Sequence, residues 1–360
     1  MSELSKEAVL QALSDIKEPG LNKSLVSAML VRDIEVNKGK VSLTLVLITP
    51  AHPFRKELEK EITEKVESLE GVKSVNLKTT VEVPADNSLQ AGAQVMIKNV
   101  IAVASGKGGV GKSTVAVNIA VALAEAGAKV GLMDADVYGP NIPLMMGVDQ
   151  LPPPNASNRI PPAVAYGVKM ISVGFMVKPS QPIVWRGPML HTAINQFVQD
   201  VDWGELDYLV VDLPPGTGDA QLSLAQTISA TGGLIVTLPQ QVSLDDARRG
   251  LEMFRELKIP LFGVVENMSY LEMPDGSKMD VFGSGGGKKL AEEAGVQFIG
   301  EIPMDPAVRE GGDNGKPVII SRPDSNAAKA LRAIAADVSL KASVIAMRNK
   351  SLSIPINIIN

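Results

Sequence analysis

The chain has 360 residues, of which 35 are Lys or Arg and 40 are Asp or Glu, so its formal net charge is −5. With 45% hydrophobic and 21% charged residues, it has a globular composition that excludes disorder of the whole chain, and its acidity argues against nucleic acid as the main partner. It contains no cysteine, which excludes disulfides, zinc fingers and thiolate-held iron–sulfur sites within the chain.

Residues 1–82 are predicted to form a small α+β domain. The expected elements, in chain order, are a helix over 6–16, strands over 28–36 and 41–48 joined by a hairpin turn, a helix between Pro53 and Gly71, and a strand over 72–77. The second helix carries one apolar stripe, made of Leu58, Ile62, Val66 and Leu69. The chain has neither a secretory-signal pattern nor the roughly 18 continuous apolar residues of a membrane span, so we expect a cytoplasmic protein without a membrane partner.

Residues 83–96 lose this periodicity and gain Pro, Ala, Gly and Gln, which predicts a linker. Over residues 97–345, short apolar runs alternate with amphipathic segments. This pattern predicts a doubly wound α/β domain, in which helices cover both faces of a mostly parallel sheet. Residues 346–360 are predicted to be a tail.

A glycine-rich segment follows the first of these strands and precedes a helical segment. It matches the phosphate-loop pattern G-x-x-x-x-G-K-[ST], and its predicted nucleotide-binding residues are Gly106, Lys107, Gly108, Gly109, Val110, Gly111, Lys112, Ser113 and Thr114. The glycines let backbone N–H groups approach phosphate oxygens, Lys112 can reach the β- and γ-phosphates, and the Ser113 hydroxyl can bind Mg²⁺. The alternative, a glycine-rich turn that only caps a helix, is disfavoured by the strand before it and by the acidic residues described below.

Lys107 is a second lysine in this loop, one residue after the first glycine. It is either a solvated surface residue or a source of extra positive charge in the transition state. With Lys107 in this position, the loop resembles the deviant Walker A loop of the dimeric ATPases that include MinD and ParA. The resemblance implies a homodimer in which Lys107 reaches the partner's nucleotide.

Acidic residues follow two of the apolar runs. Asp212 ends the run 207–212, and a lone carboxylate at the carboxyl end of a strand beside a phosphate loop is suited to bind Mg²⁺ together with Ser113. Asp136 resembles the residue that positions the attacking water in the ATPase class, and Asp134 is a second candidate. A capping role at a strand end is the alternative for both.

Asn267 follows another buried run and resembles the asparagine that binds adenine in the same class. Residues 302–305 are expected to help wall the base pocket. For these two features the alternative is an ordinary turn after a strand.

Longer segments narrow the resemblance to the Mrp/ApbC family of iron–sulfur cluster carrier ATPases. They are DADVYGPNIP (134–143), WRGPM (185–189), DLPPGTGD (212–219), ENMSY (266–270), FGSGGG (282–287) and IPMDPAVREGGDNGKP (302–317). The N-terminal domain resembles the SufT-like metal–sulfur cluster assembly domain. The resemblance covers nearly the whole chain and implies an ATP- and Mg²⁺-dependent protein that assembles iron–sulfur clusters or transfers them to apoproteins.

The chain departs from that family at its cysteines. Members usually carry C-x-x-C shortly after ENMS, where two subunits share a bridging cluster, whereas Met273 and Gly276 fall near those positions here. In the N-terminal domain, His52 stands where T-P-x-C-P has its cysteine, either as a metal ligand or as an ordinary loop residue, and His191 is expected to be structural. The family thus implies a bound iron–sulfur cluster, but the residues present predict that this chain holds none by itself.

The alternative function is that of a MinD- or ParA-like positioning or scaffolding ATPase. Its support is the basic, acid-free stretch after Val338 that contains Lys341, Arg348 and Lys350, although Pro355 disfavours a continuous surface-binding helix. A paralogue that only binds nucleotide is disfavoured because both lysines and both key aspartates are present.

Overall fold

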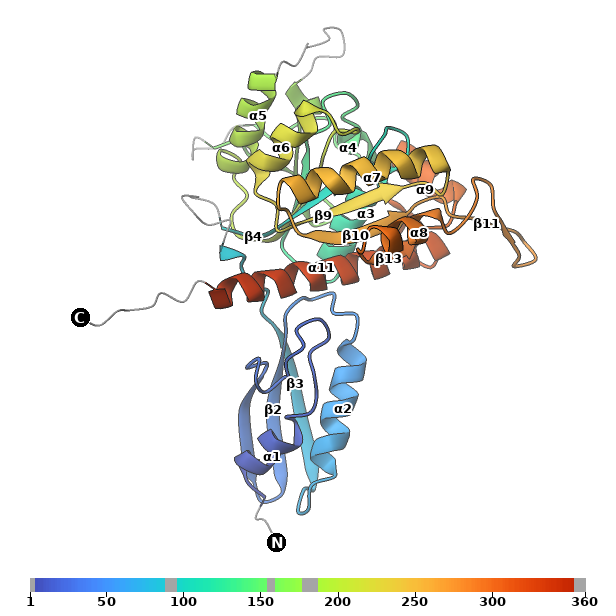
Figure 1. Ribbon diagram of the computed structural model, residues 1–360. Coiled ribbons are helices and arrows are strands. Elements are labelled where there is room, and N and C mark those ends of the chain that lie inside the picture. Colours follow the sequence, from blue (N-terminus) through green and yellow to red (C-terminus); the bar gives the residue numbers. More distant parts are fainter. Residues whose placement is uncertain (1–3, 88–95, 154–158, 177–186, 353–360) are drawn as a thin grey trace. The chain divides into compact units, whose positions relative to one another are not determined.

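The structure is a computed structural model that describes residues 4–87, 96–153, 159–176 and 187–352 (Figure 1). Chain contacts divide it into two compact units, Met1–Pro84 and Ala85–Asn360. Most of the predicted linker, the start of the WRGPM segment and the end of the predicted tail lie outside the described residues.

The first unit is a three-stranded sheet with two helices: α1 (Lys6–Ala12), β1 (Val31–Asn37), β2 (Lys40–Leu47), α2 (Arg55–Glu67) and β3 (Ser74–Val81). β1 and β2 are antiparallel and β2 and β3 are parallel. The predicted hairpin turn is present, with Lys38 and Gly39 both in the left-handed region. α1 ends four residues earlier than predicted, because the buried Leu13 and Ile16 continue the apolar pattern through a turn rather than a helix.

The second unit contains an eight-stranded sheet in the order β13-β10-β9-β4-β8-β5-β7-β6. Its strands are β4 (Ile97–Ala104), β5 (Val130–Asp134), β6 (Ala163–Ala165), β7 (Val168–Ser172), β8 (Leu206–Asp212), β9 (Gly232–Thr237), β10 (Leu261–Glu266) and β13 (Phe298–Glu301). All neighbours are parallel except β6 and β7, which confirms the predicted doubly wound α/β fold. β6 and β13 were not predicted because runs of three or four residues carry no recognisable period.

Helices cover the sheet (Figure 1). They are α3 (Lys112–Glu125), α4 (Ile142–Met146), α5 (Gly187–Gln199), α6 (Asp219–Ile228), α7 (Gln241–Glu256), α8 (Gly286–Glu293), α9 (Pro306–Asp313), α10 (Val318–Ser321) and α11 (Asn326–Leu352), with the 3₁₀ turn η2 (Val173–Met176). One hydrophobic cluster joins α5, α6, α7 and α8 to a single face of the sheet, and α3 packs against α11. None of the helices in the described ranges is long and apolar enough to cross a membrane.

The predicted boundary between the α/β domain and its tail, at 345/346, falls inside α11. This helix continues to Leu352, three residues before Pro355, so the proline lies beyond its end. The apolar residues Val344 and Ala346 are buried, which explains why the helix does not stop at 345.

Candidate nucleotide-binding site

The glycine-rich loop lies between β4 and α3 and lines a cavity of about 430 Å³. Gly109 and Gly111 have φ of 82° and 84°, a conformation that favours glycine. Gly106 is required for a different reason, because a Cβ there would lie 2.1 Å from the carbonyl carbon of Asp246 in α7. The loop is therefore shaped both by its own backbone and by close contact with α7.

Gly106→Ala is expected to lower stability by about 1–3 kcal/mol, because the loop or the backbone of α7 must move. Gly108→Ala is the matched control, since its Cβ would meet only Pro215, at 4.0 Å. Thermal unfolding of both variants tests this. Equal melting temperatures for the two would contradict the close contact.

Lys112 begins α3 and lies between two carboxylates. Its Nζ is 2.6 Å from Oδ1 of Asp212 and 3.4 Å from Oδ2 of Asp136. The Ser113 hydroxyl donates to the other oxygen of Asp212, at 2.5 Å. Ser113 and Asp212, which were predicted from separate segments, are therefore in direct contact. Their hydroxyl and carboxylate oxygens are the hard donors that suit Mg²⁺, so the residues present fit this ion.

Asp134 is fully buried at the end of β5 and organises the turn that follows. It accepts hydrogen bonds from the Ser172 hydroxyl at 2.8 Å and from the backbone N–H of Asp136 at 3.1 Å. Burial, together with the nearby Asp212 carboxylate, raises the pKa of Asp134 to about 8. Asp134 thus holds the turn that carries Asp136.

Asp136 uses its two oxygens differently. Oδ1 accepts the backbone N–H groups of Tyr138 and Gly139, at 3.1 and 3.2 Å, and Oδ2 faces Lys112. The carboxylate therefore both closes its own turn and borders the phosphate cavity, where a water that attacks phosphate would need a polar partner.

If the chain hydrolyses ATP and Asp136 positions the attacking water, Asp136→Ala is expected to slow hydrolysis by about 100-fold or more and to leave nucleotide binding largely intact. Asp136→Asn keeps an acceptor for the turn and removes the charge, and should slow hydrolysis similarly. Single-turnover kinetics beside equilibrium ATP binding separate the two steps. A loss of binding that matches the loss of rate in both variants would contradict this role.

A second cavity, of about 660 Å³, adjoins the first and shares Thr114, Asn141, Met145 and Met268 with it. Asn267 and residues 303–305 line this second cavity, so the structure brings the predicted base-pocket residues together. The amide nitrogen of Asn267 donates to the Val110 carbonyl at 2.8 Å, which the sequence did not indicate. Asn267 therefore also stabilises the backbone of the phosphate loop at Val110.

Tyr138, Asn141 and Met145 also line the phosphate cavity and were not singled out in the sequence. All three follow Asp136 within the segment DADVYGPNIP or just after it. Their position in the sequence just after Asp136 is the signal that could have identified them.

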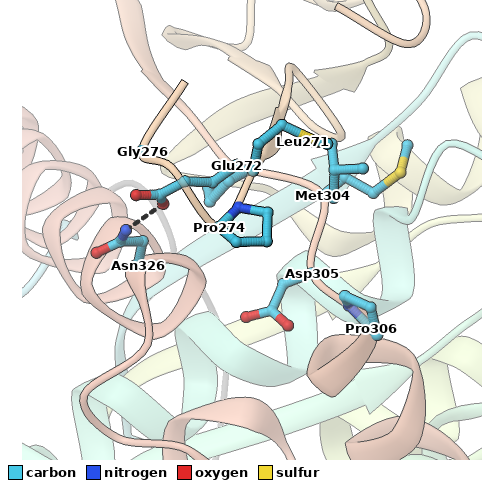
Figure 2. A pocket seen from close by; sticks show the side chains of 10 residues that line it. Leu271, Glu272, Pro274, Gly276, Met304, Asp305, Pro306 and Asn326 are labelled. Atoms are coloured by element: carbon cyan, nitrogen blue, oxygen red, sulfur yellow. Dashed lines mark hydrogen bonds between the residues drawn. The ribbon is translucent and has the colours of Figure 1, made fainter. Parts of the chain in front are cut away.

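Met273 and Gly276 lie in the small hairpin of β11 (Leu271–Glu272) and β12 (Lys278–Met279). They line a third cavity of about 310 Å³ (Figure 2). It shares residues 303–306 with the second cavity. Figure 2 shows that the Glu272 carboxylate is bound by the Asn326 amide, and Asp305 accepts the Ala307 N–H at 2.8 Å. In the described part of the chain, no group of three or more His, Cys, Asp or Glu side chains could hold a metal ion.

His52 is buried in the first unit with both ring nitrogens engaged. Its Nε2 is 2.9 Å from Oε1 of the buried Glu18, and its Nδ1 accepts the N–H of Phe54 at 3.2 Å. A metal would have to displace one of these bonds, which favours the structural role. His191 is exposed and bonds Asn195 one turn further along α5, at 3.0 Å.

Two family models match the chain. One, described as "NUBPL iron-transfer P-loop NTPase", covers residues 96–339, and the other, "Iron-sulfur cluster assembly protein", covers 6–77. The iron–sulfur cluster carrier protein of Synechocystis is 49% identical over 351 residues, which span 96% of this chain and 99% of that protein. The mouse iron–sulfur cluster transfer protein NUBPL is 48% identical over 245 residues, which span 67% of this chain and 77% of that protein.

Solved structures show the same fold. A nucleotide-binding protein from Archaeoglobus fulgidus in complex with ADP matches with a TM-score of 0.55 and 38% identity, over 61% of this chain and 87% of that one. The cell division ATPase MinD of Pyrococcus furiosus matches with a TM-score of 0.53 and 25% identity, over 67% and 98%.

Proposed function

Because the chain belongs to the family of NUBPL-type iron-transfer P-loop NTPases, we propose that it is a Mg²⁺-dependent ATPase. We propose further that it acts as a homodimer in iron–sulfur cluster assembly or in cluster transfer to apoproteins. The observation that carries the proposal is the contact of Lys112 and Ser113 with Asp212 beside the phosphate loop. The end-to-end similarity to a cluster carrier protein supports the biological role.

The charges at the site explain how Mg²⁺ and ATP would bind together. Without nucleotide, Lys112 lies between Asp212 and Asp136 and supplies one positive charge to the two carboxylates. When ATP enters, Lys112 would turn to the β- and γ-phosphates, and Asp212 and Ser113 would hold a Mg²⁺ ion whose positive charge would compensate that of the carboxylate. Neither the phosphates nor the buried carboxylate is then left without a counter-charge, so nucleotide binding should depend strongly on Mg²⁺.

Lys107 is half-buried and lines the phosphate cavity. If it reaches the partner's nucleotide in a dimer, Lys107→Ala should reduce hydrolysis by about 100-fold and weaken ATP-dependent association, with little change in ATP binding. Turnover, sedimentation velocity and calorimetric binding measure the three quantities. Lys288→Ala, which removes an exposed lysine of α8, is the matched control.

Equal losses of binding and turnover in a protein that stays monomeric would contradict this role of Lys107. They would leave the assignment of the phosphate loop itself intact.

The scaffolding alternative loses its specific support in the structure. Lys341, one of the basic residues that suggested a surface-binding helix, is paired with Asp337 at 3.1 Å and with Gln297. It lies on α11, a helix that packs against α3 within the fold.

The test of the proposed function is ATP-dependent activation of an apo-[4Fe–4S] enzyme. The chain is incubated anaerobically with iron, sulfide and glutathione as the small thiol, with and without Mg²⁺-ATP. We expect ATP to accelerate activation by the parental protein and not by the Lys112→Ala variant. Activation at the same rate with both proteins would contradict the proposal.

A further inference from the structure

Gln221 is a polar residue at a buried position of α6, where packing against the sheet favours an apolar side chain. It lies in the first turn of α6 and is only 1% exposed, on the same helical stripe as the buried Leu224, Ala225 and Ile228. Neither the nitrogen nor the oxygen of its side-chain amide has a hydrogen-bond partner in the described structure. A buried amide without partners is costly, so a glutamine here requires an explanation.

The topology places Gln221 at the same edge of the sheet as the phosphate loop. In a parallel sheet, the helix that follows a strand begins at the carboxyl edge of the sheet, and α6 follows β8. β4, which runs into the phosphate loop, lies between β8 and β9. The first turn of α6, which carries Gln221, therefore lies at the edge of the sheet where the loop begins, on the face that α6 and α7 cover.

Ser243 is a second buried polar side chain without a hydrogen-bond partner among the described residues, and it lies on the other side of β4. It lies in the first turn of α7, which follows β9. α7 is the helix whose backbone excludes any side chain at Gly106. Among the described residues, buried polar groups without hydrogen-bond partners thus lie on both sides of β4, the strand that leads into the phosphate loop.

A backbone hydrogen bond joins the segment between β8 and α6 to Ser105, at the start of the phosphate loop. The N–H of Gly216 donates to the carbonyl of Ser105, at 3.0 Å. Gly216 has φ of 100° and open space where a Cβ would lie, a backbone conformation that residues with a side chain rarely adopt. Its neighbour Pro215 lines the phosphate cavity, where a γ-phosphate would compete for the N–H.

We propose that Gln221 is a positioning residue of an ATP-dependent switch. When the γ-phosphate takes the Gly216 N–H, the Ser105 carbonyl loses its partner and the start of α6 shifts. The side-chain amide of Gln221 then forms hydrogen bonds with the backbone groups that are released at the start of the phosphate loop. ADP lacks the γ-phosphate and leaves Gln221 without partners. This inference rests on the proposed ATPase function.

The test uses Gln221→Met, which keeps the length of the side chain and removes both polar atoms. Gln226→Met is the matched control, because Gln226 is exposed on the same helix. Melting temperatures are measured without nucleotide, with Mg²⁺-ADP and with a Mg²⁺-bound non-hydrolysable ATP analogue. ATP turnover is measured in parallel.

We expect Gln221→Met to raise the melting temperature of the nucleotide-free protein, because two unpaired buried atoms are removed. Affinity for the ATP analogue should fall about tenfold, affinity for ADP should be unchanged, and turnover should fall. A purely structural glutamine would instead give a lower nucleotide-free melting temperature and equal changes with both nucleotides.

Two results overturn the inference in distinguishable ways. If the parental protein binds both nucleotides and Gln221→Met binds the analogue and ADP with an unchanged ratio, the switch role is wrong and the ATPase proposal stands. If the parental protein is stabilised by neither nucleotide, the ATPase proposal fails and the switch role fails with it.

Discussion

Lys112→Ala is expected to abolish measurable ATP hydrolysis, with a loss of at least about 100-fold, because no other described cation is placed between the two carboxylates of the phosphate site. The same change should destabilise the nucleotide-free protein. It leaves the fully buried Asp212 beside Asp136 without a counter-charge, and removing one partner of a buried ion pair typically costs about 3–5 kcal/mol.

A second substitution separates these two effects. Asp212→Asn, added to Lys112→Ala, removes the unbalanced charge and keeps an acceptor for the Ser113 hydroxyl. The double variant should recover most of the lost stability and none of the hydrolysis. Chemical denaturation of the four proteins in this cycle measures the coupling. Parental turnover in Lys112→Ala would show that the phosphate loop is wrongly assigned.

The residues of the proposed phosphate site could be singled out in the sequence because their signals are local. Glycine spacing, a lysine and a serine define the loop over eight residues, and Asp136 and Asp212 each follow a recognisable apolar run. The parallel sheet then brings strand ends that are far apart in sequence to one edge, so the contact of Ser113 with Asp212 follows from the fold class.

Other features depend on contacts that no local pattern encodes. The bond from Asn267 to Val110 joins residues 157 positions apart, and the pairing of His52 with Glu18 joins two loops of the first unit. The missing partners of Gln221 are visible only once α6 is packed on the sheet. Each is decided by tertiary packing, which the sequence periodicity does not report.

The prediction that departs furthest from the family is that this chain, by itself, holds no stoichiometric iron–sulfur cluster. A [4Fe–4S] cluster is normally bound by four thiolates, and a site shared by two subunits would take two from each. A dimer of a chain without cysteine offers none. Met273 supplies only a neutral thioether, and Gly276 supplies no side chain.

Among the residues that the structure describes, no group of carboxylate or imidazole side chains around the hairpin of Met273 could replace the missing thiolates. The nearby carboxylates Glu272 and Asp305 are engaged by Asn326 and by the N-terminus of α9. We therefore expect the protein, reconstituted anaerobically with iron and sulfide and then desalted, to retain far less than one cluster per dimer while it still binds ATP. Iron and sulfide analysis and visible absorption measure the retained cluster.

A gain-of-function variant provides the positive control. Met273→Cys combined with Gly276→Cys returns two thiolates per chain to the hairpin, and no heavy atom lies within 4 Å of a Cβ at position 276. Gly276 has φ of 82°, so the second substitution carries some backbone strain, but it lies in an exposed turn that can adjust. A dimer of this variant should retain about four irons with a sulfur-to-iron charge-transfer band. The same iron content in the parental dimer would refute the prediction and show that ligands other than cysteine suffice.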